Sequence, residues 1–219
     1  KIAMIMALIT QAFRYAYEPI VFGSVRDRNN KDLYAKAMKF FLIFTFFAYL
    51  CVIAYLDILQ YIIGNKGYRD GLKVIPIVMA SEVMMGVVFN LSFWYKLIDK
   101  TIYGAFFSIA GAIVLFAMNF LLIPVMGYMA CAWAAFAGYG TTMLLSYFIG
   151  QKHNPISYPL KEIAFYALLA LVLFVAMYFG TKQLDVVVRL MLNTLFVIVF
   201  LVVIVWKEKI VDAFRVRKN

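Results

Sequence analysis

The fold class of this chain is decided by residues 71–138, GLKVIPIVMASEVMMGVVFNLSFWYKLIDKTIYGAFFSIAGAIVLFAMNFLLIPVMGYMACAWAAFAG. It contains two apolar runs joined by the short charged link Tyr95–Thr101, and a third run begins after the predicted turn Ile123–Gly127. A helix needs about 20 apolar residues to cross the roughly 30 Å hydrocarbon core of a bilayer. Inside that core only helices and closed barrels pair every backbone N–H and C=O group. Because the runs are continuous rather than alternating, they predict membrane-spanning helices.

The composition of the whole chain points to the same class of protein. Of its 219 residues 66% are hydrophobic, and the mean hydropathy is +0.90, whereas a soluble domain is about 45–50% apolar. The net charge of +10 comes from Lys and Arg scattered through short linkers, a pattern typical of cytoplasmic loops beside anionic lipid rather than of a nucleic-acid surface. The chain opens at Lys1 on an apolar run without an initiator Met, so we expect it to be part of a longer protein.

Seven apolar segments predict an all-α, polytopic transmembrane bundle with short linkers. Alternate linkers together with the tail carry fourteen Lys and Arg residues, while the linkers of the opposite side carry five. By the positive-inside rule this bias places the C-terminus in the cytoplasm. We expect residues 1–150 to form the main group of helices, 151–206 the last two transmembrane helices and 207–219 a basic cytoplasmic tail. The predicted segments are 2–22, 39–63, 72–95, 101–123, 128–149, 162–180 and 187–206.

Motifs of soluble enzymes are missing from the sequence. It contains no glycine-rich phosphate loop, no HExxH, no CxxC pair and no nucleophile elbow. His153 lies in a polar linker without a second ligand nearby, and Cys51 and Cys131 fall within apolar runs, where we expect them to be buried packing residues. We therefore expect no enzymatic activity, no catalytic residue, no cofactor and no metal.

Small residues predict where helices approach each other closely. Ala130, Ala134 and Gly138 recur every four residues, as do Gly104, Ser108 and Ala112, and such spacing lets helix backbones come together in lipid. We expect Asn119 to hydrogen-bond a neighbouring helix, and Pro124 with Gly127 to make a tight turn. These features predict a bundle and carry no information about a substrate.

Polar residues in the first segment form its main functional candidate. Gln11, Arg14, Tyr15 and Glu18 are spaced i, i+3, i+4 and i+7, on one face of a helix, and Arg14 can pair with Glu18. Pro19 then removes a backbone hydrogen bond and allows a kink. We expect this face to line a substrate cavity, because ionisable groups in membrane segments usually face a cavity or a partner. The alternative is a pair near the membrane boundary whose side chains extend to water.

A second set of polar residues lies in the third segment. Glu82 and Asn90 are eight residues apart and share a helix face. One interpretation is that they form a proton or cation site that faces the cavity. The other is that Glu82 lies near the outer interface and is solvated. Asp57 and Gln60, near the end of the second segment, are expected at that interface.

Three stretches resemble a known family of transporters. KIAMIMALITQAFRYAYEPIVF (1–22), NLSFWYKLIDKT (90–101) and MNFLLIPVMGYMACAWA (118–134) are similar in order and spacing to bacterial flippases of lipid-linked O-antigen and capsule oligosaccharides. These belong to the multidrug/oligosaccharidyl-lipid/polysaccharide exporter superfamily. The resemblance is strongest over residues 1–180. One departure is Gly127-Tyr128-Met129-Ala130, where the family usually has Gly-Ala-Ala.

The resemblance implies a transporter of twelve to fourteen helices in two lobes. Residues 1–150 of this chain would be helices of the C-terminal lobe, followed by two trailing helices. It implies alternating-access movement of an undecaprenyl-pyrophosphate-linked oligosaccharide across the bacterial inner membrane, in company with other polysaccharide-assembly membrane proteins. Arg14 would then attract the pyrophosphate, and Glu18 would hold Arg14 between substrates or couple to an ion. The alternatives are a cation-coupled multidrug exporter of the same fold, a lipid II flippase, a membrane-bound glycosyl- or acyltransferase, and a structural subunit.

Overall fold

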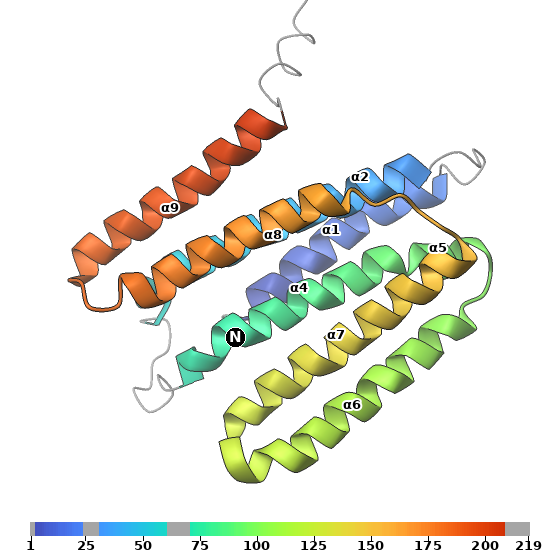
Figure 1. The fold of residues 1–219 in the computed structure, drawn as a ribbon, viewed down its shortest axis with the longest axis horizontal. Coiled ribbons are helices and arrows are strands. Elements are labelled where there is room, and N and C mark those ends of the chain that lie inside the picture. Colours follow the sequence, from blue (N-terminus) through green and yellow to red (C-terminus); the bar gives the residue numbers. More distant parts are fainter. Residues whose placement is uncertain (1–2, 24–30, 61–70, 209–219) are drawn as a thin grey trace, which may run out of the picture. The chain divides into compact units, whose positions relative to one another are not determined.

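The computed structural model describes residues 3–23, 31–60 and 71–208, and within them every regular element is a helix (Figure 1). The predicted all-helical fold class is therefore confirmed. Residues 1–2, the predicted linker residues 24–30 and 64–70, the last residues of the predicted second segment (61–63) and the tail residues 209–219 lie outside the described part. The elements are α1 Met4–Gly23, α2 Lys31–Ala54, α3 Leu56–Leu59, α4 Ile75–Leu91, α5 Phe93–Leu97, α6 Ile102–Met126, α7 Tyr128–His153, α8 Leu160–Val175, the π-helical turn η3 Ala176–Gly180 and α9 Val186–Lys207.

The described residues include five helical segments long and apolar enough to cross a membrane. These are Lys31–Ala54, Gly71–Lys96, Ile102–Met126, Leu160–Gly180 and Val186–Lys207. Helix α1 has 20 residues and α7 has 26, but α1 carries an Arg–Glu pair, and α7 is rich in small and weakly polar residues. The structure thus supports a multi-pass helical membrane protein, and the seven predicted spans stay a prediction.

Two predicted helix boundaries are wrong. The second segment was expected at 39–63, but α2 already begins at Lys31 and ends at Ala54. The predicted turn Ile123–Gly127 is mostly helix, since α6 continues through Pro124 to Met126. A proline removes only one backbone donor, so the helix continues until Gly127. There φ is +56°, a conformation that glycine adopts without steric cost.

The chain forms two compact units. Unit 1 comprises Lys1–Thr45 and Asp70–Pro159, and unit 2 comprises Phe46–Arg69 and Leu160–Asn219. Helix α2 thus contributes its first part to unit 1 and its last part to unit 2. In unit 1, α7 packs against both α4 and α6, and α4 packs against α1 (Figure 1).

Two glycines bring α6 and α7 together. A Cβ atom added at Gly138 would lie 2.9 Å from the carbonyl oxygen of Gly111, and one added at Gly111 would lie 2.9 Å from that of Gly138. Beside this crossing, the Thr142 hydroxyl donates to the carbonyl oxygen of Phe107 on α6, at 3.3 Å. The two backbones therefore approach as closely as they do only because neither position carries a side chain.

The other small residues divide between buried and exposed faces. Ala130 and Ala134 lie on the buried side of α7, each with an exposed fraction of 0%. Ser108 and Ala112, in contrast, are exposed, and the face of α6 that meets α7 contains Phe107 and Gly111 instead.

Gly138→Ala is expected to lower the free energy of unfolding by about 1–3 kcal/mol, because the new methyl group meets a backbone oxygen that moves only with its whole helix. Gly140→Ala is the matched control on the same helix, since a Cβ there would lie 3.5 Å from the flexible end of Met84. That control should be neutral or slightly stabilising. Thermal unfolding in detergent measures both changes, and equal melting temperatures for the two variants would contradict the close crossing.

Unit 2 contains a polar network where α2 ends. The chain leaves the α-helix at Tyr55, and the Ile58 N–H bonds to the carbonyl oxygen of Tyr55. The carbonyl oxygen of Ala54 accepts a hydrogen bond from the Asn193 side-chain amide of α9, at 3.3 Å. Asp57 forms an ion pair with Arg189 of α9, with 2.6 Å between Oδ2 and Nε, and its expected position at the outer interface stays a prediction. A side chain of α9 thus satisfies a backbone oxygen at the end of α2.

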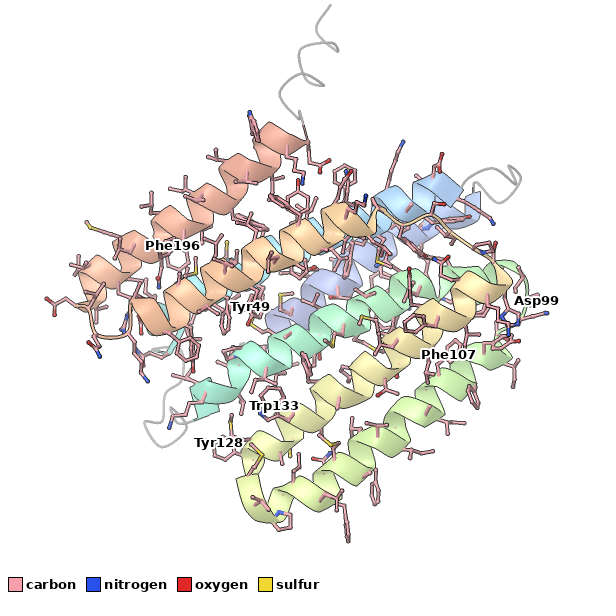
Figure 2. All side chains as sticks on the ribbon, viewed as in Figure 1. Tyr49, Asp99, Phe107, Tyr128, Trp133 and Phe196 are labelled. Atoms are coloured by element: carbon pink, nitrogen blue, oxygen red, sulfur yellow. The ribbon has the colours of Figure 1, made fainter. Side chains whose placement is uncertain are left out.

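The link between α5 and α6 turns at Asp99, whose φ is +55°. The Lys100 N–H donates to the carbonyl oxygen of Tyr95, at 2.8 Å, which satisfies an acceptor at the end of α5. Aspartate is among the few residues that adopt this left-handed conformation with modest strain. Figure 2 shows Asp99 at this link and Tyr128 at the opposite end of α7.

Candidate functional site

The candidate site lies in unit 1, where α1 packs against α4 and α5. On α1, Thr10, Phe13, Arg14 and Tyr17 are spaced i, i+3, i+4 and i+7 and therefore share one face. Helices α4 and α5 are separated only by Ser92. Polar and aromatic side chains of both elements consequently reach α1, and the residues of α4 and α5 at the site are Gly86, Phe89, Asn90, Phe93 and Lys96.

One carboxylate lies between two cations at this site. Glu18 Oε2 is 3.5 Å from Arg14 Nε, and Glu18 Oε1 is 3.3 Å from Lys96 Nζ. All three side chains are partly buried. The cluster therefore carries two positive charges against one negative charge.

Arg14 is held by its charge and by aromatic rings. Its guanidinium carbon lies 4.9 Å from the ring centroid of Phe89 and 5.7 Å from that of Tyr15, within cation–π range. Its Nε is buried and forms an ion pair with Glu18 that lacks hydrogen-bond geometry. Within the described residues this Nε–H has no hydrogen-bond partner.

A small cavity lies beside Arg14. The cavity has a volume of about 10 Å³. This is close to the minimum that one water molecule needs. Thr10 is 3% exposed, and its hydroxyl oxygen has no hydrogen-bond partner in the described part of the chain. The Asn90 side-chain amide donates to the carbonyl oxygen of Gly86, at 3.0 Å. The lining residues are Thr10, Phe13, Arg14, Tyr17, Phe41, Gly86, Phe89, Asn90 and Phe93.

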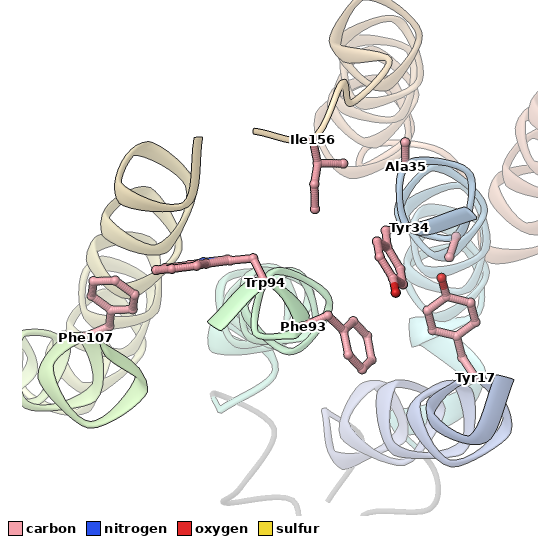
Figure 3. Close-up of a cluster of buried hydrophobic side chains, with 8 residues drawn as sticks. Tyr17, Tyr34, Ala35, Phe93, Trp94, Phe107 and Ile156 are labelled. Atoms are coloured by element: carbon pink, nitrogen blue, oxygen red, sulfur yellow. The ribbon is translucent and has the colours of Figure 1, made fainter. Parts of the chain in front are cut away.

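Aromatic side chains cover one end of the site. Figure 3 shows Phe93 and Trp94 extending from α5 in opposite directions, Phe93 toward Tyr17 and Tyr34 and Trp94 toward Phe107. The ring centroids of Tyr17 and Phe93 are 5.7 Å apart, in an edge-to-face arrangement, and the Tyr17 hydroxyl donates to the carbonyl oxygen of Leu33, at 3.2 Å. This end of unit 1 is therefore closed by packed rings.

The segment 154–159, which follows α7, packs onto the same end. Lys31 Nζ donates to the carbonyl oxygen of Pro155, at 2.9 Å, and Gln151 Nε2 donates to that of Ile156, at 2.7 Å. Burial, and to a smaller extent the nearby Tyr17 and Tyr147, raises the pKa of the Tyr158 hydroxyl above its ordinary value, so this group stays neutral at physiological pH.

The structure brings together some of the predicted cavity residues and separates others. Arg14 and Glu18 pair, and Arg14 and Asn90 line the same cavity. Gln11 is exposed and Tyr15 is 64% exposed, so neither lines the cavity. The face of α1 that packs against α4 is rotated from the predicted polar face: it contains Thr10, Phe13 and Arg14, whereas Gln11 and Tyr15 are left out of it.

Glu82 lies apart from the cavity. It is half-buried on α4, close enough to Tyr139 of α7 for an electrostatic interaction. Asn119, expected to bond a neighbouring helix, instead donates to the carbonyl oxygen of Leu115 in its own helix, at 3.0 Å.

Lys96 and Thr10 are among the site residues that the sequence analysis missed. Lys96 had been assigned to a cytoplasmic link, and Thr10 had not been considered. A signal for Lys96 was its position seven residues after Phe89, which places both on one helix face. Thr10 carried no comparable signal, since a single threonine in an apolar run is ordinary.

Residues considered for metal or redox chemistry lie elsewhere. Cys51 is partly buried, whereas Cys131 is exposed, contrary to its expected packing role, because it points away from the buried side of α7. His153 contacts the Tyr103 hydroxyl at 3.1 Å and the Ile149 carbonyl oxygen at 3.0 Å. Residues 3–23, 31–60 and 71–208 include no group of three or more His, Cys, Asp or Glu side chains that could hold a metal.

No family model, no curated protein and no solved structure matches this chain.

Proposed function

We propose that this chain is the C-terminal lobe of a membrane transporter that moves a lipid-linked oligosaccharide with an anionic pyrophosphate group across the bacterial inner membrane by alternating access. The observation that carries the proposal is the cluster of Arg14, Lys96 and Glu18, in which two cations lie against a single carboxylate inside an apolar bundle. The resemblance of residues 1–22, 90–101 and 118–134 to oligosaccharide flippases supports the same substrate class.

The chemistry of these side chains favours a phosphate ligand. The guanidinium group of Arg14 presents donors in a planar fork that matches phosphate oxygens, and Lys96 adds a compact positive charge. A pyrophosphate offers oxygens to both cations at once. Because the site is partly buried, each interaction is screened less than it would be in water.

The sign of the charge separates this function from the multidrug alternative. A lumen for cationic drugs requires an excess of carboxylates, whereas the Arg14 cluster has an excess of positive charge. Glu82, the other carboxylate of the predicted cavity, does not line the cavity beside Arg14. The cluster therefore favours an anionic substrate.

The proposed topology has seven spans with the C-terminus in the cytoplasm. Its support is the bias of fourteen Lys and Arg residues against five. Lys31, Lys96 and Lys152 then lie at the cytoplasmic ends of their helices, and the aromatic cluster around Trp94 closes the bundle on that side. With about 10 Å³ of free space, the site is in a closed state, and α1 has to move away from α4 and α5 to admit a substrate.

Reconstitution of the complete protein into liposomes tests this function. A polyprenyl-pyrophosphate-linked oligosaccharide is placed in the outer leaflet, and the loss of its accessibility to an external glycosidase is followed over time. We expect protein-dependent loss of accessibility, with none in protein-free liposomes, and no accumulation of a lipophilic cationic dye. Transport of the dye without movement of the oligosaccharide would overturn the proposal in favour of a drug exporter.

A further inference from the structure

We infer that Glu18 is an internal competitor of the substrate: its carboxylate occupies Arg14 and Lys96 when no phosphate is bound, and a pyrophosphate displaces it by exchange of ion pairs. This inference rests on the proposed function, because it specifies how the same site receives and releases an anion. Glu18 thereby acts as a positioning residue that sets the affinity of the site.

The geometry of the carboxylate suits an exchange of this kind. Its two oxygens contact different cations, Oε2 with Arg14 Nε at 3.5 Å and Oε1 with Lys96 Nζ at 3.3 Å. Strong charge-assisted hydrogen bonds are about 2.7–2.9 Å long. Both pairs are longer than this, so the carboxylate satisfies each cation only in part, and an anion with more oxygens can bind both better.

Unused donors next to Glu18 show what the incoming group should be. The buried Arg14 Nε–H and the Thr10 hydroxyl have no hydrogen-bond partner within the described residues. Thr10 is 3% exposed, and both residues line the small cavity beside the cluster. Buried donors without partners are costly. An acceptor with several oxygens, such as a diphosphate, would satisfy them, whereas Glu18 does not.

The position of Glu18 also links anion binding to movement. Glu18 and Arg14 belong to α1, whereas Lys96 belongs to α5, 78 residues further along the chain. In the described residues, the Glu18–Lys96 contact is the ion pair that joins α1 to α5. A pyrophosphate bound to both Arg14 and Lys96 would take the place of this pair, so the link between α1 and α5 then depends on the anion and is lost when the anion leaves.

The affinity for inorganic pyrophosphate tests the inference directly. Isothermal titration of the complete protein in detergent, at fixed pH and ionic strength, compares the wild type with Glu18→Gln, which keeps the side-chain shape and removes the charge. We expect Glu18→Gln to bind pyrophosphate about five- to tenfold more tightly, because the competing charge is gone. In liposomes the same variant should transport more slowly, because release of the anion is no longer assisted.

Two matched variants keep the test specific. Asp57→Asn removes the carboxylate that pairs with Arg189 in unit 2 and should leave pyrophosphate affinity unchanged. Lys96→Gln should weaken pyrophosphate binding. If Glu18→Gln does not yield folded protein, Glu18→Asp, which withdraws the carboxylate by one methylene group, should still tighten binding relative to the wild type.

The outcomes separate this inference from the proposed function. The role of Glu18 is overturned if the wild type and Glu18→Gln bind pyrophosphate with equal affinity. It is also overturned if Asp57→Asn tightens binding as much as Glu18→Gln does. Both conclusions hold even if the protein transports the oligosaccharide. Tighter binding by Glu18→Gln in a protein that moves no oligosaccharide supports the exchange and overturns the proposed substrate.

Discussion

Replacing Arg14 with glutamine is expected to abolish oligosaccharide transport, with a loss on the order of a hundredfold or more. The variant removes the charge that the proposed phosphate contacts and leaves Glu18 with Lys96 as its remaining ion-pair partner at this site. Transport by the variant is measured in the liposome assay and as restoration of surface polysaccharide in cells that lack the transporter. The amount of protein in the membrane should stay near the wild-type level, because Arg14 is only partly buried.

Arg189→Gln is the control for this experiment. Arg189 is also partly buried and also paired with a carboxylate, but it lies in unit 2. We expect this variant to lower stability and to retain transport. Wild-type transport by Arg14→Gln, with both proteins present in equal amounts, would remove Arg14 from the mechanism.

Trp94→Ala is expected to give the largest loss of stability, about 3–5 kcal/mol. Trp94 is 2% exposed, and its ring packs against those of Tyr95, Tyr103 and Phe107. Its Nε1–H donates to the Ser146 hydroxyl of α7, at 3.4 Å. A smaller side chain leaves a cavity where α5, α6 and α7 meet. The change is measured by denaturant unfolding in detergent micelles.

Trp206→Ala serves as the comparison, since Trp206 of α9 is 82% exposed. Its effect should stay within about 0.5 kcal/mol. A similar loss of stability in both variants would show that the aromatic cluster around Trp94 does not hold this end of unit 1 together.

The apolar runs determined that the chain is helical and predicted the positions of most of its helices. Each run exceeds the length of an ordinary soluble strand, and backbone hydrogen bonding in an apolar medium leaves a helix as the local solution. The spacing of Arg14 and Glu18, four residues apart, was also enough to predict their pair, because neighbours on one helix face depend on helix geometry alone. Helix ends were less predictable, since α6 continues through Pro124, where a turn was expected.

The tertiary structure alone decided which faces of these helices meet. A helix that is apolar on all sides does not reveal which side packs against protein and which is left exposed, so the small-residue face of α6 was misplaced and Cys131 was expected inside. The contact of Lys96 with Glu18 joins residues 78 positions apart. Thr10 became a site residue only through the packing of α4 on α1. Local spacing therefore supplied the Arg–Glu pair, and long-range packing supplied the second cation, the cavity and the aromatic packing at one end of unit 1.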